Sequence, residues 1–468
     1  MKRKIYYLLS ICWLLSSIWE VPAQVPPALK AFIQKENLRH AAIGFKVVDM
    51  GSEKVIADYN SSVSLTPASC MKIVTTATAL DVLGAGFRYE TPLLYDGFIN
   101  NSVLEGNLYV LGTGDPTLGS EYFEDNRESF PDEWLAGIQA SGIRSVSGDL
   151  IVLDQLFGYE GISKKWLWED LGNYYAPGIY AISVFDNMYS LQLQSYSDNT
   201  QPVILSITPE IEGISFINDI TVKEANRHET AIFGLPFSYE RRLYGTMPPN
   251  RTSYVLKGDI PDPGLLLAKY LKTYWQQYGV IINGKATTAR LNIQSSGNRN
   301  VLAKVQSPSL AAIIHVINVK SNNHFSEHLF RTLQMKAVDI PAYWKEKGLD
   351  SSALFMHDGS GIAPANAVST GFLLDLLLYM DKKEGREGAF FQSLPVAGKE
   401  GTVTSFLKNT SLQGKAYVKS GSMTDVQSYS GYVEKGNKRY AFSLIINRFT
   451  GERSELRKEI EQLLTGLF

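Results

Sequence analysis

The sequence predicts an α+β protein with more than one domain, on three observations. β-Type runs occur near both ends of the chain, the long middle stretch is rich in short β-type runs, glycine and turn residues, and helical periodicity dominates from Pro263 onward. With 468 residues, 44% of them hydrophobic and 20% charged, the chain can bury a large core divided over two or three domains.

The first 23 residues are typical of a signal peptide. The basic segment Met1–Lys4 leads into an apolar run, Ile5–Trp19, and Val21–Ala23 supplies small residues at the spacing that a signal peptidase recognises. The run is shorter than the ~20 residues that span a bilayer, and no stop-transfer charges follow it. We therefore expect cleavage after Ala23, export to the periplasm or cell envelope, and no transmembrane anchor in the mature chain.

The cysteine content argues against a disulfide within the mature protein, and the net charge argues against nucleic acid as a partner. Cys12 lies in the apolar run without the small residue that a lipoprotein site needs just before it, so lipid anchoring is a minor alternative. Removal of the signal leaves Cys70 alone, so no disulfide can form within the chain. With 45 basic and 47 acidic residues the net charge is -2, and nucleic acid is not an expected partner.

Residues 24–90 are expected to begin the first domain. Ala41–Asp49 and Lys54–Asn60 predict two strands, and the turn-like segment Met50–Glu53 between them predicts an antiparallel hairpin. After Pro67, the segment Ala68–Leu83 carries apolar residues at helical spacing, with proline at the entry, where its missing N–H matters least. A buried helix is therefore expected to follow the hairpin.

Residues 91–262 are expected to form a β-rich insertion. Short β-type runs such as Asn107–Gly112 and Gly148–Val152 alternate there with glycine and turn residues. We expect two small domains in this stretch, with residues 106–190, approximately, nested in the other.

Residues 263–468 are expected to return to the first domain. Helical periodicity covers four stretches, Leu265–Tyr278, Ser309–Val319, Asn323–Ala337 and Thr370–Lys383. Three β-type runs and a terminal helix follow, at Ala416–Gly421, Gln427–Glu434, Arg439–Arg448 and Arg453–Leu467. The apolar stripe of the last helix is expected to face a core rather than a membrane. We expect the two ends of the chain to share one antiparallel sheet.

A serine and a lysine at helical spacing are the first candidates for chemistry. Ser69 and Lys72 are three residues apart near the start of the predicted helix, so they share one face of it. A serine hydroxyl needs an adjacent base, and a lysine can be that base where burial or a neighbouring cation lowers its pKa. The pattern alone is weak, because a second copy occurs at Ser405–Lys408.

Two further motifs accompany the first copy in a defined order. Ser321-Asn322-Asn323 opens a helical stretch, and Lys419-Ser420-Gly421 lies on a β-type run near the C-terminus. The trio resembles the S-x-x-K, S-D-N and K-T-G motifs of penicillin-binding proteins and β-lactamases, with Asn322 in place of the aspartate and Ser420 in place of the threonine.

Within that group the chain resembles the low-molecular-mass class C penicillin-binding proteins, the D-alanyl-D-alanine carboxypeptidase and endopeptidase family (serine peptidase family S13), from about residue 30 onward. About 250 residues separate Ser69 from Ser321, as in a family that carries two inserted domains there. The resemblance implies an antiparallel sheet flanked by helices, like that of β-lactamases, with β-rich insertions. Five stretches support it: Gly114–Leu118, Ser147–Leu150, Asp358–Gly361, Leu394–Gly398 and Gly401–Thr402.

The same resemblance implies catalytic roles without a metal or organic cofactor. Ser69 would attack the carbonyl between two D-alanines, Lys72 would take its proton, and Ser321 would relay a proton to the leaving amine. Asn323 would hold Lys72 and the substrate amide. Penicillin and other β-lactams would acylate Ser69.

Substrate contacts are implied at the third motif. Lys419 would keep the site electropositive, and Ser420 would bind the carboxylate at the end of a peptidoglycan stem peptide. The backbone N–H groups of Ser69 and of Ser422, just after Gly421, would form the oxyanion hole.

A stretch of the insertion resembles one that lines the family's cleft. It contains Trp168–Asp170 and Tyr174–Tyr175. Asp170 would pair with the amine of a diaminopimelyl side chain, and Tyr175 would also bind the substrate. The alternative is that these aromatic residues fill the core of the small domain.

Three alternatives invoke other residues. His324–His328 matches the H-x-x-E-H zinc signature, with Glu400 as a possible third ligand of a metallopeptidase. His357 beside Asp358 allows a serine triad, although Asp358 and Ser360 are more readily explained as turn residues. Cys70 is an alternative nucleophile, but only Ser69 shares a helix face with Lys72.

Two alternatives keep the fold and change the outcome of the chemistry. A β-lactamase would rapidly hydrolyse the acyl-enzyme, and no deacylating glutamate can be identified in the sequence. A non-catalytic cell-wall binding protein would have a broken motif set, whereas all three motifs are intact here.

Overall fold

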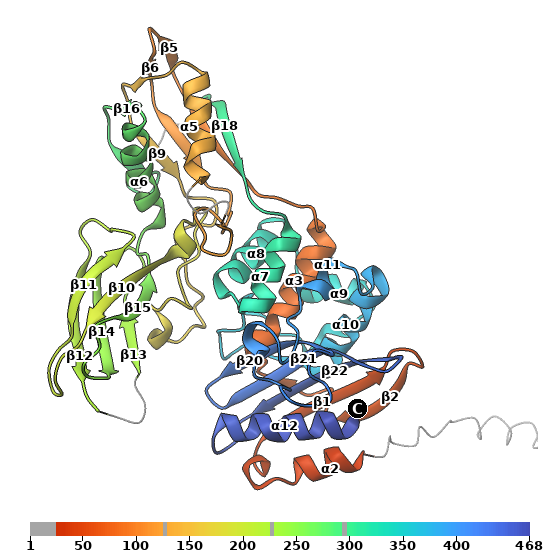
Figure 1. Ribbon diagram of the computed structural model, residues 1–468. Coiled ribbons are helices and arrows are strands. Elements are labelled where there is room, and N and C mark those ends of the chain that lie inside the picture. Colours follow the sequence, from red (N-terminus) through yellow and green to blue (C-terminus); the bar gives the residue numbers. More distant parts are fainter. Residues whose placement is uncertain (1–24, 125–128, 225–228, 293–296) are drawn as a thin grey trace, which may run out of the picture.

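The computed structural model describes residues 25–124, 129–224, 229–292 and 297–468. The predicted signal peptide and Cys12 lie outside these residues. Figure 1 shows a body of sheet and helices that carries both ends of the described chain, and an elongated insertion beside it. Within the described ranges, no helix is both long enough and apolar enough to cross a membrane.

One five-stranded antiparallel sheet joins the two ends of the chain, as predicted. Its order is β2-β1-β22-β21-β20, so the N-terminal hairpin pairs with the C-terminal strands. Helices α2 (Pro27–Ile33) and α12 (Arg453–Leu467) lie together beneath the sheet (Figure 1). The strands are β1 (Ala42–Asp49), β2 (Lys54–Tyr59), β20 (Ala416–Met423), β21 (Val426–Lys435) and β22 (Lys438–Asn447).

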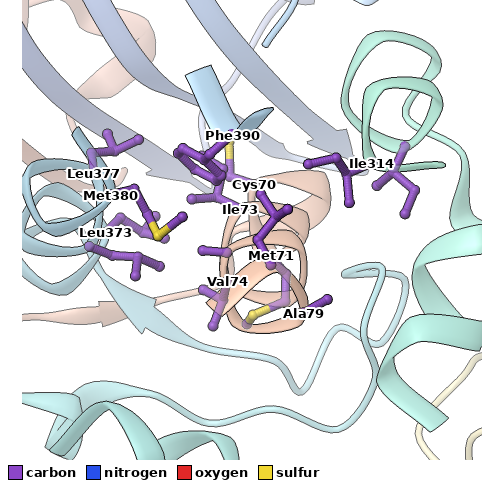
Figure 2. Close-up of a cluster of buried hydrophobic side chains, with 14 of the residues drawn as sticks. Cys70, Met71, Ile73, Val74, Ala79, Ile314, Leu373, Leu377, Met380 and Phe390 are labelled. Carbon is purple, nitrogen blue, oxygen red and sulfur yellow. The ribbon is translucent and has the colours of Figure 1, made fainter. Parts of the chain in front are cut away.

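Helix α3 (Met71–Leu83) lies at the centre of the helices that cover the other face of this sheet. Its first ten residues are all buried, Lys72 and three threonines included, as expected of a helix that has neighbours all round. Figure 2 shows Ile73 and Val74 of α3 among Ile314, Leu373 and Leu377. The surrounding helices are α7 (Leu310–Lys320), α8 (Asn323–Met335), α9 (Ile340–Glu346), α10 (Thr370–Glu384) and α11 (Ala389–Ser393).

Short elements complete this body. Strands β3 (Ser64–Leu65) and β19 (Val368–Ser369) pair with each other beside the main sheet. The 3-10 turns are η1 (Glu36–Leu38), η2 (Ala68–Cys70), η5 (Ser351–Ala353) and η6 (Gly401–Val403).

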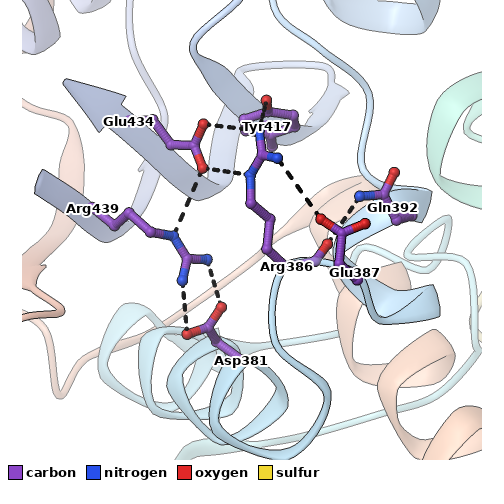
Figure 3. Close-up of polar contacts among 7 residues, drawn as sticks. All are labelled: Asp381, Arg386, Glu387, Gln392, Tyr417, Glu434 and Arg439. Carbon is purple, nitrogen blue, oxygen red and sulfur yellow. Dashed lines mark hydrogen bonds and ion pairs between the residues drawn. The ribbon is translucent and has the colours of Figure 1, made fainter. Parts of the chain in front are cut away.

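Arginine side chains fasten α10 and the segment after it to the edge of the main sheet (Figure 3). Arg439 of β22 binds both carboxylate oxygens of Asp381, at 2.5 and 3.2 Å. Arg386 donates to Glu434 of β21 at 2.8 Å and to the hydroxyl of Tyr417 of β20 at 3.0 Å. Paired, charge-assisted bonds of this kind fix relative orientation, so they hold β20 against the helical layer.

The insertion contains two groups of sheets. The first consists of a five-stranded sheet, β17-β9-β7-β4-β18, and a four-stranded sheet, β16-β8-β6-β5, covered by two helices. Its elements are β4 (Glu90–Tyr95), β5 (Phe98–Asn100), β6 (Val103–Glu105), β7 (Leu108–Leu111), α5 (Phe130–Ala140), β8 (Ser145–Val146), β9 (Leu150–Leu153), α6 (Pro263–Gln277), β16 (Ile281–Ile282), β17 (Ala286–Thr288) and β18 (Asn300–Gln306).

The second group holds two three-stranded sheets, β11-β10-β15 and β12-β14-β13. Turns η3 (Trp168–Asp170) and η4 (Phe185–Asn187) precede it, and Trp166, just before η3, donates a hydrogen bond to Asp358 of the main body. Its strands are β10 (Met188–Gln194), β11 (Val203–Thr208), β12 (Ser215–Val222), β13 (Thr230–Phe233), β14 (Glu240–Met247) and β15 (Tyr254–Asp259).

The strand pairing departs from the expected limits of the insertion in two ways. The segment 263–306, expected in the first domain, contributes α6 and three strands to the insertion, where Leu267, Leu271 and Trp275 are fully buried. The nested group comprises residues 188–259 rather than 106–190. Periodicity identified α6 correctly as a helix but carries no information about which sheet its apolar face covers.

Candidate active site

Ser69 lies in the turn η2, directly before the buried helix α3. The preceding residue, Ala68, has a φ of 47°, which is unfavourable for any residue other than glycine. Gly361 supports the turn, because a Cβ at that position would lie 1.9 Å from the carbonyl oxygen of Ala68. Residues held in such conformations by their surroundings often lie at functional sites. The strained turn presents Ser69 half-buried at the end of the helix.

Lys72 is fully buried and touches the predicted nucleophile. Its Nζ lies 3.0 Å from Ser69 Oγ, 2.6 Å from Asn323 Oδ1 and 2.6 Å from the carbonyl oxygen of Ser360. Burial holds the pKa of Lys72 well below its usual value, and the positive charge of Lys419 lowers it further. A lysine in this state can accept a proton from the serine.

The loop Asp358–Gly361 positions Lys72, a role that the sequence did not predict. The Gly359 carbonyl oxygen accepts hydrogen bonds from Thr75 of α3 and Ser326 of α8, at 2.6 and 2.7 Å. These bonds fix the next carbonyl, that of Ser360, toward Lys72. The only signal in the sequence was the resemblance of this stretch to a known family. The contact itself could not be predicted, because every residue type has a backbone carbonyl group.

Ser321 and Lys419 meet across the cleft. Lys419 Nζ donates to Ser321 Oγ at 3.0 Å and to the Ser420 carbonyl oxygen at 2.7 Å. Burial lowers the pKa of Lys419 to about 8. Ser321 ends α7 with a φ of 57°, a left-handed conformation that turns its hydroxyl away from the helix.

Strand β20 approaches the nucleophile turn so closely that only glycine fits at the contact. A Cβ on Gly421 would lie 2.5 Å from the Pro67 carbonyl oxygen and 2.8 Å from the Cys70 backbone nitrogen. The next residue, Ser422, therefore lies beside the turn. The hydroxyl of Ser420 is 2.8 Å from that of Thr402, which the sequence had placed in a matching stretch without a role.

Two hollows meet at Ser69 and Ser422, which line both of them. One, of about 590 Å³, extends past Ser321 and Ser420 toward α12. The other, of about 750 Å³, extends past Asn323 toward the insertion. A substrate chain crossing Ser69 would have one part in each hollow.

Asp170 and Tyr175 of the insertion both line the second hollow. The Tyr175 hydroxyl donates to Asp170 at 3.1 Å, and burial raises the pKa of the Asp170 carboxyl. Asn323 Nδ2 donates to the Tyr175 carbonyl oxygen at 2.7 Å, which ties this segment to the site. Of the neighbouring aromatics, Trp168 and Tyr174 are 67% and 53% exposed, so they do not fill a core.

The second Ser-x-x-Lys copy lacks the geometry of the first. Ser405–Lys408 lies in a series of turns, and Leu407 has a φ of 58°, so the serine and lysine are not on one helix face. Cys70 is buried and its thiol donates to the Lys419 carbonyl oxygen at 3.3 Å. Burial raises the pKa of that thiol, which disfavours the thiolate.

Asp358 organises a turn rather than a triad. Its carboxylate accepts bonds from the backbone N–H groups of Gly361 and Ala363, at 2.8 and 2.6 Å, and from the side chain of Asn366 at 2.7 Å. Trp166 of the insertion supplies a fourth bond at 2.9 Å.

The residues of the H-x-x-E-H pattern have separate partners. His324 Nε2 is 2.5 Å from Ser183 Oγ, and His328 Nδ1 is 2.8 Å from the Gly114 carbonyl oxygen. Glu327 accepts the Ser360 N–H at 2.7 Å, and Glu400 accepts the Val396 N–H at 3.0 Å. Among the residues that the structure describes, no three histidine, cysteine or carboxylate side chains gather as metal ligands would.

A serine hydroxyl bonded to a buried lysine, opposite a second lysine–serine pair at the edge of an antiparallel sheet, is the arrangement of a serine acyl-transfer enzyme. The chain matches the model of the D-Ala-D-Ala carboxypeptidase 3 (S13) family over residues 26–467 and belongs to that family.

Characterised relatives cover most of the chain. It is 24% identical to the D-alanyl-D-alanine carboxypeptidase DacB of Haemophilus influenzae, over 87% of this chain and 86% of the relative. It is 26% identical to the D-alanyl-D-alanine carboxypeptidase of Actinomadura sp. strain R39, over 90% of this chain and 81% of the relative.

Solved structures share the fold. The crystal structure of penicillin-binding protein 4 from Haemophilus influenzae superposes with a TM-score of 0.80, at 23% identity, over 95% of this chain and 98% of that one. A predatory endopeptidase from Bdellovibrio bacteriovorus, acylated by penicillin G, superposes with a TM-score of 0.50, at 15% identity, over 91% of each chain. The multidomain α+β fold predicted from sequence, with a penicillin-binding-protein-like body, is thus confirmed.

Proposed function

We propose that this protein is a serine D-Ala-D-Ala carboxypeptidase that also acts as an endopeptidase on peptidoglycan cross-links. The observation that carries the proposal is the 3.0 Å contact between Ser69 Oγ and the Nζ of Lys72, a lysine whose pKa burial lowers. Family membership and relatives named as D-alanyl-D-alanine carboxypeptidases support the substrate class. The fold shared with a penicillin-acylated endopeptidase agrees with the second activity.

The reaction proceeds in two halves through an ester on Ser69. Lys72 takes the hydroxyl proton while Ser69 Oγ attacks the carbonyl carbon of the penultimate D-alanine. The peptide C–N bond then breaks, and the leaving amine receives a proton through Ser321, which Lys419 holds in place. Water next attacks the ester, and Ser69 regains its proton. Splitting the reaction this way replaces one high barrier with two lower ones.

The surrounding groups bind the substrate on either side of Ser69. The backbone N–H groups of Ser69 and Ser422 face the developing oxyanion, and Asn323 holds both Lys72 and the substrate amide. Ser420, with Thr402 bonded to it, receives the carboxylate of the leaving D-alanine.

Asp170 and Tyr175 contact the side chain of the stem peptide in the second hollow. An ionised Asp170 there attracts an amine such as that of a diaminopimelyl residue.

We also propose how the chain is divided into domains and where the mature enzyme acts. The peptidase domain consists of the mature chain before β4 and the part after β18, and the insertion lies between them. The first 23 residues act as a cleaved signal that sends the enzyme to the periplasm or cell envelope, where its polymer is.

Labelled penicillin tests the mechanism directly. The mature protein is incubated with the label, digested and mapped by mass spectrometry, with Ser69→Ala and Lys72→Met as comparisons. We expect one adduct, on Ser69, that is absent from S69A and forms at least about 1,000-fold more slowly in K72M. An adduct on any other residue, or none, contradicts the proposal.

The lifetime of that adduct separates the remaining alternatives. A penicilloyl ester that persists supports the peptidase, whereas rapid release of hydrolysed penicillin indicates a β-lactamase. Loss of peptidase activity in EDTA, with S69A unaffected, would indicate the zinc mechanism.

A further inference from the structure

The hollow that extends from Ser69 toward α12 lies on the leaving-group side of the scissile bond. Ser321 and Ser420, which the proposed mechanism places next to the leaving amine and its carboxylate, both line it. Asp170 and Tyr175, which face the other part of the substrate, line the opposite hollow instead.

This hollow is larger than the leaving group of a carboxypeptidase requires. Its volume is about 590 Å³, within the ~300–1,000 Å³ of sites that hold drug-sized ligands. A single D-alanine would fill only the part next to Ser420. The remainder extends along the loop that carries Thr402 and Ser405 to the first turns of α12.

Two arginines of α12 line the far part, and only one of them is free to bind a ligand. Arg453 donates to the carbonyl oxygens of Met423 and Val426, at 2.6 and 2.7 Å, and to Gln427 at 3.0 Å, so its guanidinium is occupied. Arg457 is half-buried and donates to Ser405 Oγ at 3.0 Å. This partner is a neutral hydroxyl, and none of the ion pairs within the described residues involves Arg457.

The loop that presents Ser405 to Arg457 is held rigidly. Phe406 stacks on Tyr429 of the sheet with ring centres 4.0 Å apart and planes 6° apart. The Leu407 N–H donates to Glu461 of α12 at 2.8 Å. The guanidinium and the hydroxyl are therefore held in place before a ligand arrives, which lowers the entropic cost of binding. Glu452 is exposed and also lines the hollow.

We propose that Arg457 and Ser405 bind a carboxylate of the second stem peptide, the strand that leaves when a cross-link is cut. The inference rests on the proposed function and adds its substrate: the far part of the hollow accepts the acidic peptide of a cross-linked dimer. It also gives a role to the second Ser-x-x-Lys pattern, whose serine holds the specificity-determining arginine.

Two substrates and three variants test this inference. The substrates are a stem pentapeptide ending in D-Ala-D-Ala, whose leaving group is D-alanine, and a cross-linked muropeptide dimer, whose leaving group is a whole stem peptide. The variants are Arg457→Gln, Arg457→Lys and Lys458→Gln. The last removes the same charge from an exposed neighbouring position of α12, outside the hollow.

We expect Arg457→Gln to reduce kcat/KM for the dimer at least about tenfold, because a charge-assisted hydrogen bond is lost, and to alter the ratio of dimer to pentapeptide cleavage by the same factor. R457K should restore part of the loss, and K458Q should leave the ratio within about twofold of wild type. Equal loss on both substrates, or no loss on the dimer, overturns the inference.

Amidation of the leaving strand's carboxylates gives an independent readout. Wild type should cleave the amidated dimer about as slowly as R457Q cleaves the ordinary dimer, and combining both changes should add little, as for two partners of one contact. Additive losses would show that Arg457 acts elsewhere. Failure of the proposed function is distinguishable: without the endopeptidase activity wild type would leave the dimer uncut, and without the serine mechanism it would cleave neither substrate and would not be acylated by penicillin.

Discussion

The proposed mechanism uses two buried lysine amines, each hydrogen-bonded to a serine hydroxyl. It needs one of them neutral and the other charged. Lys72 must be neutral to take a proton from Ser69, and burial together with the charge of Lys419 lowers its pKa. Lys419 must stay charged to hold Ser321 and attract a carboxylate, and its pKa is lowered to about 8. The positive charge of Lys419 therefore helps to keep Lys72 neutral, so that Lys72 can act as a base.

Acylation should have a bell-shaped dependence on pH. Below the lowered pKa of Lys72 the base is protonated and the rate falls; above about pH 8 Lys419 loses its charge and the rate falls again. In Lys419→Arg the guanidinium keeps its charge, so the alkaline limb should move up by more than about one pH unit, although the maximum rate is lower. The measurement is the rate constant of penicillin acylation between about pH 5 and pH 10.

The position of the alkaline limb, not the height of the curve, is the decisive result. An alkaline limb that stays near pH 8 in K419R would show that another group titrates there. Protein concentration and unfolding temperature, measured for each variant at each pH, control for loss of folded enzyme.

At this scale the sequence was most informative where contacts are local. Ser69 and Lys72 share a helix face, and their three-residue spacing was enough to pair them. The bonds from Lys72 to Asn323 and to the Ser360 carbonyl oxygen join segments more than 250 residues away. Spacing cannot predict such contacts, and a carbonyl group is common to every residue type.

The fit between strand β20 and turn η2 decides how the proposed nucleophile, Ser69, lies relative to the proposed oxyanion donor of Ser422. Gly421 makes this contact: a Cβ there would lie within 2.4 to 2.8 Å of Ser428, Pro67 and Cys70. Two of these neighbours present backbone atoms, which cannot move as a flexible side chain can.

Gly421→Ala should therefore push β20 away from the turn and misplace Ser422 relative to Ser69. We expect acylation by penicillin to fall by about 100-fold, because a displacement of about 1 Å in a site has that effect. The free energy of unfolding should fall by only ~1–3 kcal/mol, as for an overpacked core. Acylation rate and urea denaturation measure the two effects separately.

Gly86→Ala is the matched control, since a Cβ at Gly86 would meet no atom within 4 Å and the residue has no left-handed φ. It should change neither quantity appreciably. Retention of the wild-type acylation rate in G421A would show that the strand adjusts without cost to the site.

Sequence periodicity predicted the local elements well but not their partners. The hairpin of β1 and β2, helix α3 and the three C-terminal strands lie where expected. Helix α6 also forms where predicted, yet it covers a sheet of the insertion, where β16 and β17 pair with β8 and β9 from more than 100 residues earlier. Such parallel pairings depend on tertiary contacts that a periodic pattern does not encode.

Two buried histidines of α8 contribute to the contact between the insertion and the main body. His324 meets Ser183 of the insertion, and His328 meets the Gly114 carbonyl oxygen. Both imidazoles are buried, and one ring nitrogen of each, Nδ1 of His324 and Nε2 of His328, has no hydrogen-bond partner within the described residues. The same helix begins at Asn323, so this interface also positions the catalytic cleft.

Burial keeps these histidines neutral. It lowers the pKa of His324 well below the usual value, with His328 adding to the effect, and lowers the pKa of His328 to about 4. In the unfolded chain a histidine titrates near 6.5. Neutral His328 therefore contributes stability that is fully present above about pH 6.5 and is lost as the pH falls toward 4.

Other groups of the interface titrate in the opposite sense. Burial raises the pKa of Asp115 to about 6 and also raises that of Glu327, so these carboxyls favour the folded state as the pH falls. The pH dependence of wild type alone is thus a sum of opposing contributions, and the difference between wild type and a histidine variant isolates one of them.

Replacing His328 with glutamine should remove its acid sensitivity while keeping a donor for the Gly114 carbonyl oxygen. At neutral pH H328Q should be the less stable protein, because the packing of the ring is lost. Between about pH 6.5 and pH 4 the wild type should lose up to ~1.4 kcal/mol of unfolding free energy per pH unit relative to H328Q, so the gap narrows or reverses. Urea denaturation across this range measures it, with the exposed His40→Gln as control. A gap that stays constant with pH would show that His328 is not held neutral at this interface.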